Sequence, residues 1–133
     1  MAREMRHIAT TFGDIAFTDR GDGPVALFLH GVFLNSHLWR HIIDQVVDRR
    51  RCIAIDLLAH GMTRTPADQD VSFTAQAEML NAVCESLDVE QIDLVANDSG
   101  GAIAQIFAAR HPERIRSLTP TFTTIGRRRR LNP

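Results

Sequence analysis

The sequence contains no lysine, only two cysteines and no long apolar run, and each absence excludes a class of protein. No stretch approaches the roughly 18 to 20 apolar residues that a membrane helix requires, and the first eleven residues lack the apolar core of a secretory signal. Cys52 and Cys84 lie within separate apolar patterns, which favours two buried, reduced thiols over a disulfide framework. We therefore expect a cytoplasmic globular protein, and its 133 residues suit one domain.

All 15 basic residues are arginine, a bias that fits a GC-rich coding sequence better than a functional demand. Four of them are consecutive, Arg127 to Arg130, so the net charge of -1 combines this run with an acidic body. A single basic run without interleaved aromatic residues is weak evidence for a nucleic-acid or membrane site. We expect no specific nucleic-acid partner and no membrane partner.

Short apolar runs alternate with longer segments of helical period, a pattern typical of an α/β fold with a mostly parallel sheet and flanking helices. A first pair of short strands around His7 to Thr18 is expected to turn at Gly13-Asp14. Continuous apolar runs predict buried strands at Val25 to Leu29, Cys52 to Ile55, Ile92 to Ala96 and from Ile115 to Leu118.

Three segments of the chain have helical spacing. The first is expected from an N-cap at Ser36 to about Val47. The others run from about Phe73 to Leu87 and from Ala102 to Arg110, where His111-Pro112 ends the helix. Residues 56–70 are polar and rich in turn formers, and they predict a long surface loop.

The most informative segment lies where the strand ending at Ala96 turns sharply into a helix. A turn of this kind can hold a strained nucleophile, provided that the residues two before and two after it are small. Ala96 and Gly100 satisfy that spacing for a nucleophile at Asp98. If Ser99 were the nucleophile, the bulkier Asn97 would occupy one of the small positions. We therefore favour Asp98 and keep Ser99 as the alternative.

Four segments, in order, resemble the N-terminal half of an α/β-hydrolase fold protein over about residues 12–118. They are the strand and His-Gly turn 27–31, the loop 56–61, the turn 96–101 and the helix end 111–115. The loop resembles the family's D-x-x-G-H-G form, except that Ala59 stands where glycine is usual. Each segment alone is weak evidence, whereas four in order at the family spacing identify the chain as a member.

An aspartate at this turn resembles the haloalkane dehalogenase and epoxide hydrolase branches of the family. The resemblance implies that Asp98 attacks a saturated carbon of a small organic substrate and forms a covalent ester, which a histidine-activated water then hydrolyses. It assigns the oxyanion donors to the backbone N–H groups of Val32 and Ser99, and it implies no metal or other cofactor. Four further positions are assigned to substrate binding: His30, Gly31, Phe33 and Asn97.

The sequence also departs from both branches. Dehalogenases of this pattern hold the halide with an asparagine after the His-Gly pair and a tryptophan after the nucleophile, where this chain has Val32 and Ser99. Epoxide hydrolases usually have an aromatic residue and then proline after His-Gly, and Val32-Phe33 matches neither position. The substrate is therefore open between epoxide and haloalkane types. The alternatives are a serine esterase that uses Ser99 and a non-catalytic fragment.

A working site of this family also needs a histidine and an orienting acid, which the resemblance places after later strands. The only histidine after Asp98 is His111, which resembles a structural residue at the far end of the helix. We therefore expect residues 1–119 to be the N-terminal part of an α/β-hydrolase domain, lacking the cap and the last strands and inactive alone. Residues 120–133 are expected to form an irregular Arg-rich tail, produced by a frameshift near Thr119. The strand at Ile115 would then have an unpaired edge, through which we expect self-association.

Overall fold

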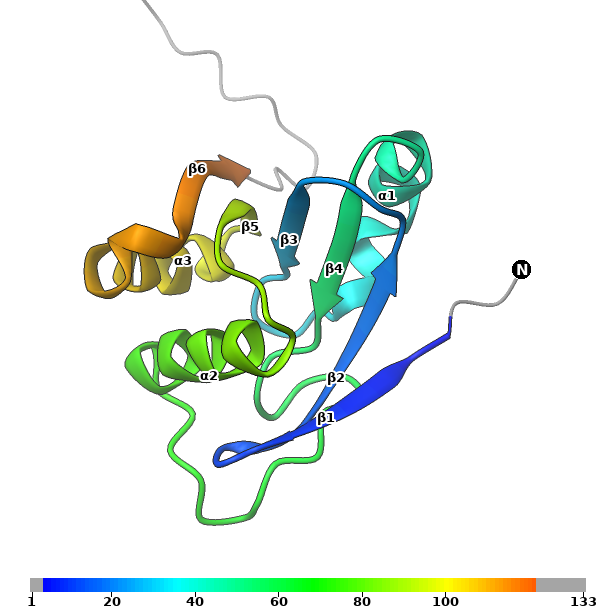
Figure 1. Cartoon of the computed structure of the whole chain (residues 1–133). Coiled ribbons are helices and arrows are strands. Elements are labelled where there is room, and N and C mark those ends of the chain that lie inside the picture. The colour runs from blue at the N-terminus through cyan, green and yellow to red at the C-terminus, as the bar shows by residue number, and fades with distance from the viewer. Residues whose placement is uncertain (1–3, 122–133) are drawn as a thin grey trace, which may run out of the picture.

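The computed structural model describes residues 4–121, so the tail to which the frameshift hypothesis refers lies almost wholly outside the described residues. Within them the chain forms a six-stranded sheet with the strand order β1-β2-β4-β3-β5-β6 (Figure 1). The strands are β1 (Arg6–Thr10), β2 (Gly13–Arg20), β3 (Val25–Leu29), β4 (Arg51–Ile55), β5 (Ile92–Asn97) and β6 (Ile115–Thr121). This sheet and its helices confirm the predicted α/β class.

The central strand β3 pairs in parallel with β4 on one side and with β5 on the other. β5 pairs in parallel with β6, whereas β2 is antiparallel to both β1 and β4. Because β3, β4 and β5 run in the same direction, the loops that follow them all leave the sheet at the carboxyl ends of the strands. His30, Asp56 and Asp98 are the first residues beyond these three strands.

The hairpin between β1 and β2 turns at Thr11-Phe12, so the predicted turn at Gly13-Asp14 is wrong. Gly13 instead opens β2 and pairs with Thr10. It has a φ of +141°, and a Cβ atom there would lie 2.4 Å from the carbonyl oxygen of Arg64. The glycine is therefore required by the close approach of a distant loop, which the local sequence does not reveal.

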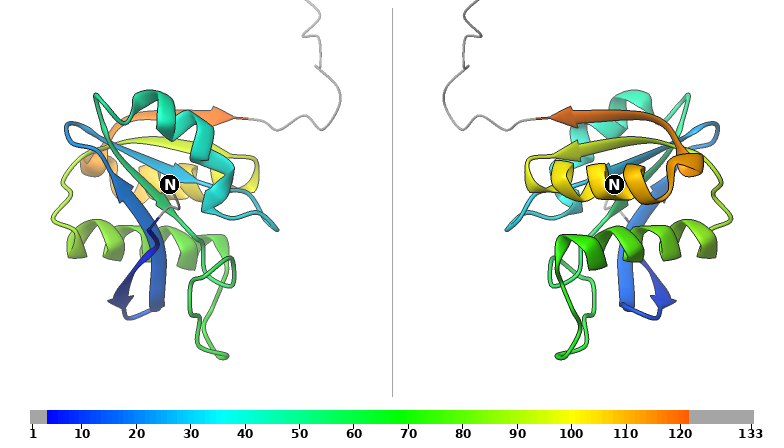
Figure 2. Two further views of the ribbon diagram at one scale, coloured as in Figure 1. Left: turned by 90° about the vertical axis from the view of Figure 1, so that its right-hand side faces the viewer. Right: turned by 90° about the vertical axis from the view of Figure 1, so that its left-hand side faces the viewer.

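The helices cover both faces of the sheet (Figures 1 and 2). The α1 helix (Arg40–Val46) lies on one face, and α2 (Phe73–Ser86) and α3 (Ser99–Arg110) lie side by side on the other. Side chains of β3 alternate between the two faces. Phe28 packs against Trp39 on the α1 face, with ring centroids 5.3 Å apart. Leu27 joins Met79 and Phe107 in the larger core on the opposite face.

The segment before α1 begins with a short 3-10 helix, η1 (Ser36–Trp39), whose N-cap is Asn35 and not the predicted Ser36. The Asn35 side chain accepts a 2.9 Å hydrogen bond from the His37 N–H. The Ser36 N–H donates instead to Asp56 Oδ1 at 2.7 Å. Both residues are good capping types, and a contact between distant parts of the chain decides which one caps.

The loop between β4 and α2 was expected to lie on the surface, but its first three residues belong to the interior. Asp56, Leu57 and Leu58 are at most 2% exposed. The Leu58 N–H donates to Gln76 of α2 at 2.9 Å, and the Gln76 side chain donates back to the Leu58 carbonyl at 3.1 Å. The start of the loop is thus fixed to the helix that follows it.

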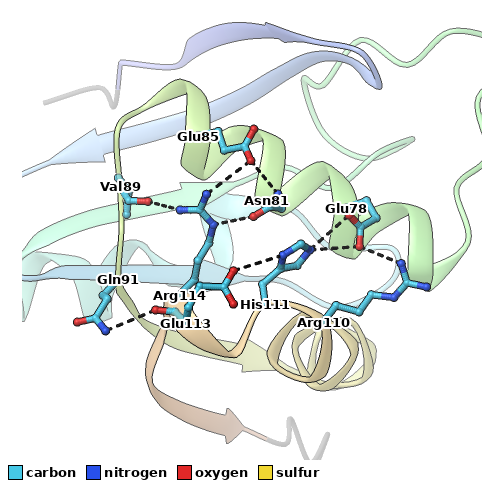
Figure 3. A network of polar contacts seen from close by, with 9 residues as sticks. All are labelled: Glu78, Asn81, Glu85, Val89, Gln91, Arg110, His111, Glu113 and Arg114. Carbon is cyan, nitrogen blue, oxygen red and sulfur yellow. Dashed lines mark hydrogen bonds and ion pairs between the residues drawn. The ribbon is translucent and has the colours of Figure 1, made fainter.

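A polar network joins α2 to the end of α3 and to the short helix η2 (Pro112–Arg114) (Figure 3). Glu78 bonds Arg110 at 3.1 Å and the His111 ring at 3.2 Å. Arg114 donates two hydrogen bonds of 2.6 Å, to the side chain of Asn81 and to the carbonyl of Val89. His111 therefore lies at the helix end, where it holds two helices together.

Cys52 and Cys84 are buried free thiols, as predicted. Burial raises the pKa of the Cys84 thiol to about 11, which keeps it in its unreactive, protonated form. Within residues 4–121, every helix is too short or too polar to span a membrane.

Strand β6 lies at the edge of the sheet, and β5 is its only hydrogen-bonded neighbour among the described residues. Its last two residues, Pro120 and Thr121, lie beyond the domain boundary predicted at residue 119. Ser117 ties the strand to β5 through a 2.7 Å hydrogen bond to Asp93. Self-association through this edge stays a prediction.

Candidate active site at the end of strand β5

Strand β5 turns into helix α3 through one residue, Asp98. Asp98 has φ 51° and ψ -118°, a backbone conformation that residues other than glycine rarely adopt. Ser99 is already the first residue of the helix. The tip of the turn is therefore Asp98.

The packing around the turn explains why its neighbours are small. Ala96 is fully buried, and a Cβ atom on Gly100 would lie 2.6 Å from the carbonyl oxygen of His30. A Cβ atom on Gly101 would meet nothing within 4 Å. The close approach of helix and strand thus restricts the residue two after Asp98 and leaves the residue two after Ser99 unrestricted.

The backbone of Asp98 is held in place, but its side chain is exposed. Its N–H donates to the Thr121 carbonyl at 3.0 Å, and its carbonyl accepts from the Gly101 N–H at 2.8 Å. Among residues 4–121 its carboxylate has no hydrogen bond and no ion pair. The turn therefore presents an accessible carboxylate from a fixed backbone.

The loop after β3 runs directly beside this turn. A Cβ atom on Gly31 would lie 3.3 Å from Asp98 Cβ, so glycine allows the two segments to approach. The next residue, Val32, donates its N–H to Ser99 Oγ at 2.6 Å. Phe33 follows with φ 66° and a side chain that is 95% exposed. An exposed aromatic residue in the left-handed region is strained, a feature that no sequence pattern indicated.

The structure thus brings Gly31, Val32 and Ser99 together around Asp98. Asn97, which the resemblance assigned to substrate binding, is 3% exposed, and its Oδ1 lies 3.2 Å from Thr121 Oγ1 of β6. This contact faces the neighbouring strand, whereas Asn97 Nδ2 would lie 3.5 Å from a Cβ atom on Gly31. The assigned roles of all these residues stay predictions.

His30 is completely buried, and both of its ring nitrogen atoms bond backbone groups. Nδ1 lies 2.7 Å from the Gly31 carbonyl, and Nε2 accepts from the Leu57 N–H at 3.0 Å. This pattern requires the neutral ring with its proton on Nδ1. Burial lowers the pKa of His30, and this outweighs the opposing effect of the hydrogen bond to Gly31. The contacts favour a structural role over the predicted substrate-binding role.

Asp56 holds together the loops that surround the site, a role that the sequence did not reveal. Its buried carboxylate accepts hydrogen bonds from the Ser36 N–H at 2.7 Å and the Met62 N–H at 2.9 Å. A Cβ atom on Gly61 would lie 2.3 Å from the same carboxylate. An aspartate at the start of the 56–61 loop and a glycine at its end were the sequence signal that could have indicated this role.

Metal centres and grooves are two other kinds of site that the described residues could form away from Asp98. Among the described residues no group of three His, Cys, Asp or Glu side chains is placed to hold a metal ion. An open groove of about 970 Å³ lies between the start of β1, strand β2 and the η1–α1 segment. Its lining includes Arg6, Arg20 and Asp44 but not Asp98.

The chain is similar to known proteins over most of its length. A family model described as "alpha/beta hydrolase fold" matches residues 24–121. A haloalkane dehalogenase from Mesorhizobium japonicum is 44% identical over 96 residues, which are 72% of this chain and 31% of that protein. A 2-hydroxymuconate semialdehyde hydrolase from Pseudomonas sp. strain CF600 is 36% identical over 106 residues, which are 75% of this chain and 36% of that protein.

Solved structures show the same similarity. A loop variant of a haloalkane dehalogenase from Bradyrhizobium elkanii superposes with a TM-score of 0.82 at 36% identity, over 90% of this chain and 40% of that one. An epoxide hydrolase from Vigna radiata has a TM-score of 0.85 at 28% identity, over 98% of this chain and 44% of that one. The chain spans about a third of the length of the curated relatives it matches.

Proposed function

Because the chain belongs to the α/β-hydrolase fold family, we propose that it carries the nucleophile of a hydrolase and that this nucleophile is Asp98. One observation carries the proposal. The residue at the tip of the β5–α3 turn has positive φ, and its exposed carboxylate has no partner among residues 4–121. A strained turn that exposes a single side chain is the arrangement in which this fold holds its nucleophile.

The reaction we propose is attack by the Asp98 carboxylate on a saturated carbon of a small electrophile. A bond forms between a carboxylate oxygen and that carbon, and the bond from the carbon to its leaving group breaks. The product is an ester on Asp98. Haloalkane dehalogenases and an epoxide hydrolase among the similar proteins support haloalkanes and epoxides as the substrate classes.

The second step would be attack by water on the carbonyl carbon of this ester. Negative charge then develops on the carbonyl oxygen of the ester. The backbone N–H groups of Val32 and Ser99 are the donors proposed to stabilise it. Their segments flank Asp98, and the Val32 N–H would exchange its 2.6 Å bond to Ser99 Oγ for one to the charged oxygen in this step. We assign no water-activating role to His30 or His60, because the ring nitrogen atoms of both already bond backbone groups.

This division of steps supports a specific proposal for the chain as it stands. It forms the ester and does not hydrolyse it, since we assign no described residue to activate the water of the second step. The ester should therefore accumulate instead of turning over. An accumulated ester is directly measurable.

The test is intact-mass spectrometry of the purified chain after incubation with a small epoxide or a bromoalkane. We expect one adduct, which adds the mass of the epoxide or of the alkyl group to the chain. Peptide mapping should place this adduct on Asp98. Asp98→Asn should not be labelled. Asp68→Asn, which changes an exposed loop carboxylate, should be labelled like the wild type.

The two alternatives predict different results. A serine esterase would be acylated at Ser99 by an activated ester such as p-nitrophenyl acetate, and Asp98→Asn would leave that acylation intact. A non-catalytic fragment would show no labelling above the Asp98→Asn control. Either result contradicts the proposed role of Asp98.

A further inference from the structure

Residues 31–34 form a β-turn in a conformation that their own side chains do not favour. The Leu34 N–H donates to the Gly31 carbonyl at 3.1 Å. Phe33 has a φ of 66° whereas the φ of Val32 is not positive, which is the combination typical of a type II turn. Such a turn usually has glycine or asparagine at the position of Phe33, because a larger side chain there is strained. Another contact must therefore hold this turn.

A type I turn is the unstrained alternative for the same four residues. It keeps the hydrogen bond from Leu34 to Gly31 and gives both central residues a negative φ. The two turns differ by a flip of the Val32–Phe33 peptide group, which exchanges the directions of the Phe33 N–H and the Val32 carbonyl. The Phe33 side chain is 95% exposed, so its packing does not select the strained form. A partner of the peptide group itself must do so.

That partner is the ring of His60. The Phe33 N–H donates to His60 Nε2 at 3.2 Å, and His60 Nδ1 lies 2.8 Å from the Leu58 carbonyl. Because a neutral imidazole has one donor and one acceptor nitrogen atom, these bonds place the proton on Nδ1 and leave Nε2 as the acceptor. Among residues 4–121 the Val32 carbonyl accepts no hydrogen bond. A flip of the peptide group would therefore give up only its bond to His60.

We propose that His60 is a positioning residue for the 31–34 turn, and that its protonation switches this turn from type II to type I. When Nε2 gains a proton from solvent, it can no longer accept the Phe33 N–H, because both ring nitrogen atoms are then donors. The peptide flip turns the Val32 carbonyl toward the ring, where it accepts a hydrogen bond from Nε2. The charge of one side chain thus selects between two hydrogen-bonding arrangements of the turn.

Titratable side chains from three strands or their ends lie around His60. The His30 ring, which follows β3, has its centroid 5.1 Å from that of His60, and burial lowers the pKa of His30. The Asp56 carboxylate, which follows β4, lies against Gly61, the residue next to His60. His7 of β1 bonds a backbone carbonyl of the same loop at 3.1 Å. The half-buried His60, between a carboxylate and a neutral His30, is thus the ring placed to take up a proton in mild acid, where histidine changes charge.

The switch would redirect an aromatic side chain beside Asp98. A Cβ atom on Gly31 would lie 3.3 Å from Asp98 Cβ, so the turn lies against the segment that carries the proposed nucleophile. A change of the Phe33 φ from positive to negative points its side chain in a new direction. Acid would therefore change how Phe33 meets a substrate. This consequence rests on the proposed function, whereas the switch itself does not.

The experiment measures nuclear Overhauser contacts in the isotope-labelled full chain between about pH 8 and about pH 5, where histidine titrates. A type II turn brings the Val32 Hα close to the Phe33 N–H, whereas a type I turn brings the two N–H groups close together. We expect the first contact in mild base, and its loss with the gain of the second contact in acid. His60→Gln offers an amide oxygen that accepts but does not titrate, so it should keep the type II contact throughout. His7→Gln is the control and should keep the wild-type transition.

His60→Ala tests the same point without acid, so it decides the question even where the fold does not survive at low pH. Its turn should be type I throughout, because no bond then holds the peptide group in the strained form. A type II turn in His60→Ala, a wild-type turn that stays type II in acid, or a transition that persists in His60→Gln each overturns the inference. The buried amide of Leu27 reports whether each variant is folded. The labelling test of Asp98 uses none of these variants, so the two proposals can fail separately.

Discussion

His30 and His60 each accept a hydrogen bond from the backbone of the loop that carries the other. His30 Nε2 accepts the Leu57 N–H at 3.0 Å, and His60 Nε2 accepts the Phe33 N–H at 3.2 Å. Their ring centroids lie 5.1 Å apart. The loops that follow β3 and β4 are therefore joined by a reciprocal pair of bonds, and each bond requires a ring nitrogen atom without a proton.

We expect the free energy of unfolding to decrease on acidification because His30 is buried in its neutral form. Its pKa in the folded chain is lowered below the ordinary 6.5, so the unfolded chain binds the proton more readily. The stability contributed by the neutral ring is fully present above about pH 6.5 and is lost as the pH falls toward the lowered pKa. Urea unfolding should show a lower midpoint near pH 5.5 than near pH 8.

His30→Gln should be less stable and should lose most of this pH dependence, whereas the exposed His41→Gln should keep it. The lowered pKa values of Glu78 and Asp93 act at lower pH, because their ordinary values are 4.5 and 3.8. Equal midpoints for the wild type at the two pH values would contradict the prediction.

Gly100→Ala and Gly101→Ala should have opposite effects. The added methyl group at position 100 would lie 2.6 Å from the His30 carbonyl oxygen, so helix α3 must move away from β3. We expect a loss of about 1 to 3 kcal/mol, typical of overpacking. At position 101 the methyl group meets nothing within 4 Å, and alanine in a helix gains about 0.5 to 1 kcal/mol over glycine. Urea titrations of both variants measure the difference, and a stable Gly100→Ala would refute the packing argument.

Asp56→Ala should strongly destabilise the chain. It leaves the N–H groups of buried Ser36 and of Met62 without their acceptor, and each hydrogen bond to a charged group contributes about 1.5 to 3 kcal/mol. Amide hydrogen exchange should accelerate at both positions. Asp70→Ala, which removes an exposed carboxylate that bonds Ser72 at 2.9 Å, is the control and should leave both amides protected.

Ala59→Gly should stabilise the chain slightly. Ala59 has φ 62°, where an L-residue with a Cβ atom is disfavoured by about 1 to 2 kcal/mol. The greater freedom of glycine in the unfolded chain offsets part of this gain, so we expect at most about 1 kcal/mol. Ala67→Gly, in the same loop but without positive φ, should be destabilising. Thermal unfolding of the two variants measures both effects. A gain in stability at position 67 or a loss of stability at position 59 would contradict the prediction.

The sequence predicted the elements that depend on local apolar patterns. The buried strands were recognised because continuous apolar runs fill both faces of a central strand. The turn at Asp98 was recognised because its packing needs small residues at fixed spacing, and Gly100 occupies that position. These features depend on residues that are close together in the chain.

The features that were mistaken or missed depend on distant contacts. Asn35 caps η1 because Asp56 binds the neighbouring Ser36 N–H, and Gly13 is required by the carbonyl of Arg64. In both cases the local residue types allow more than one outcome. The bond between Val32 and Ser99 joins residues 67 positions apart, so no local pattern could indicate it.

The order of the strands has a consequence for how residue 98 can vary. The chain leaves β3 through α1 toward β4 and later passes to the opposite side of β3, through α2, to reach β5. Such a topological switch point is fixed by connectivity and not by the side chains around it. Asparagine and glycine both tolerate positive φ, so they can replace Asp98 while the backbone keeps its place. Chemistry and architecture are therefore separable at this position.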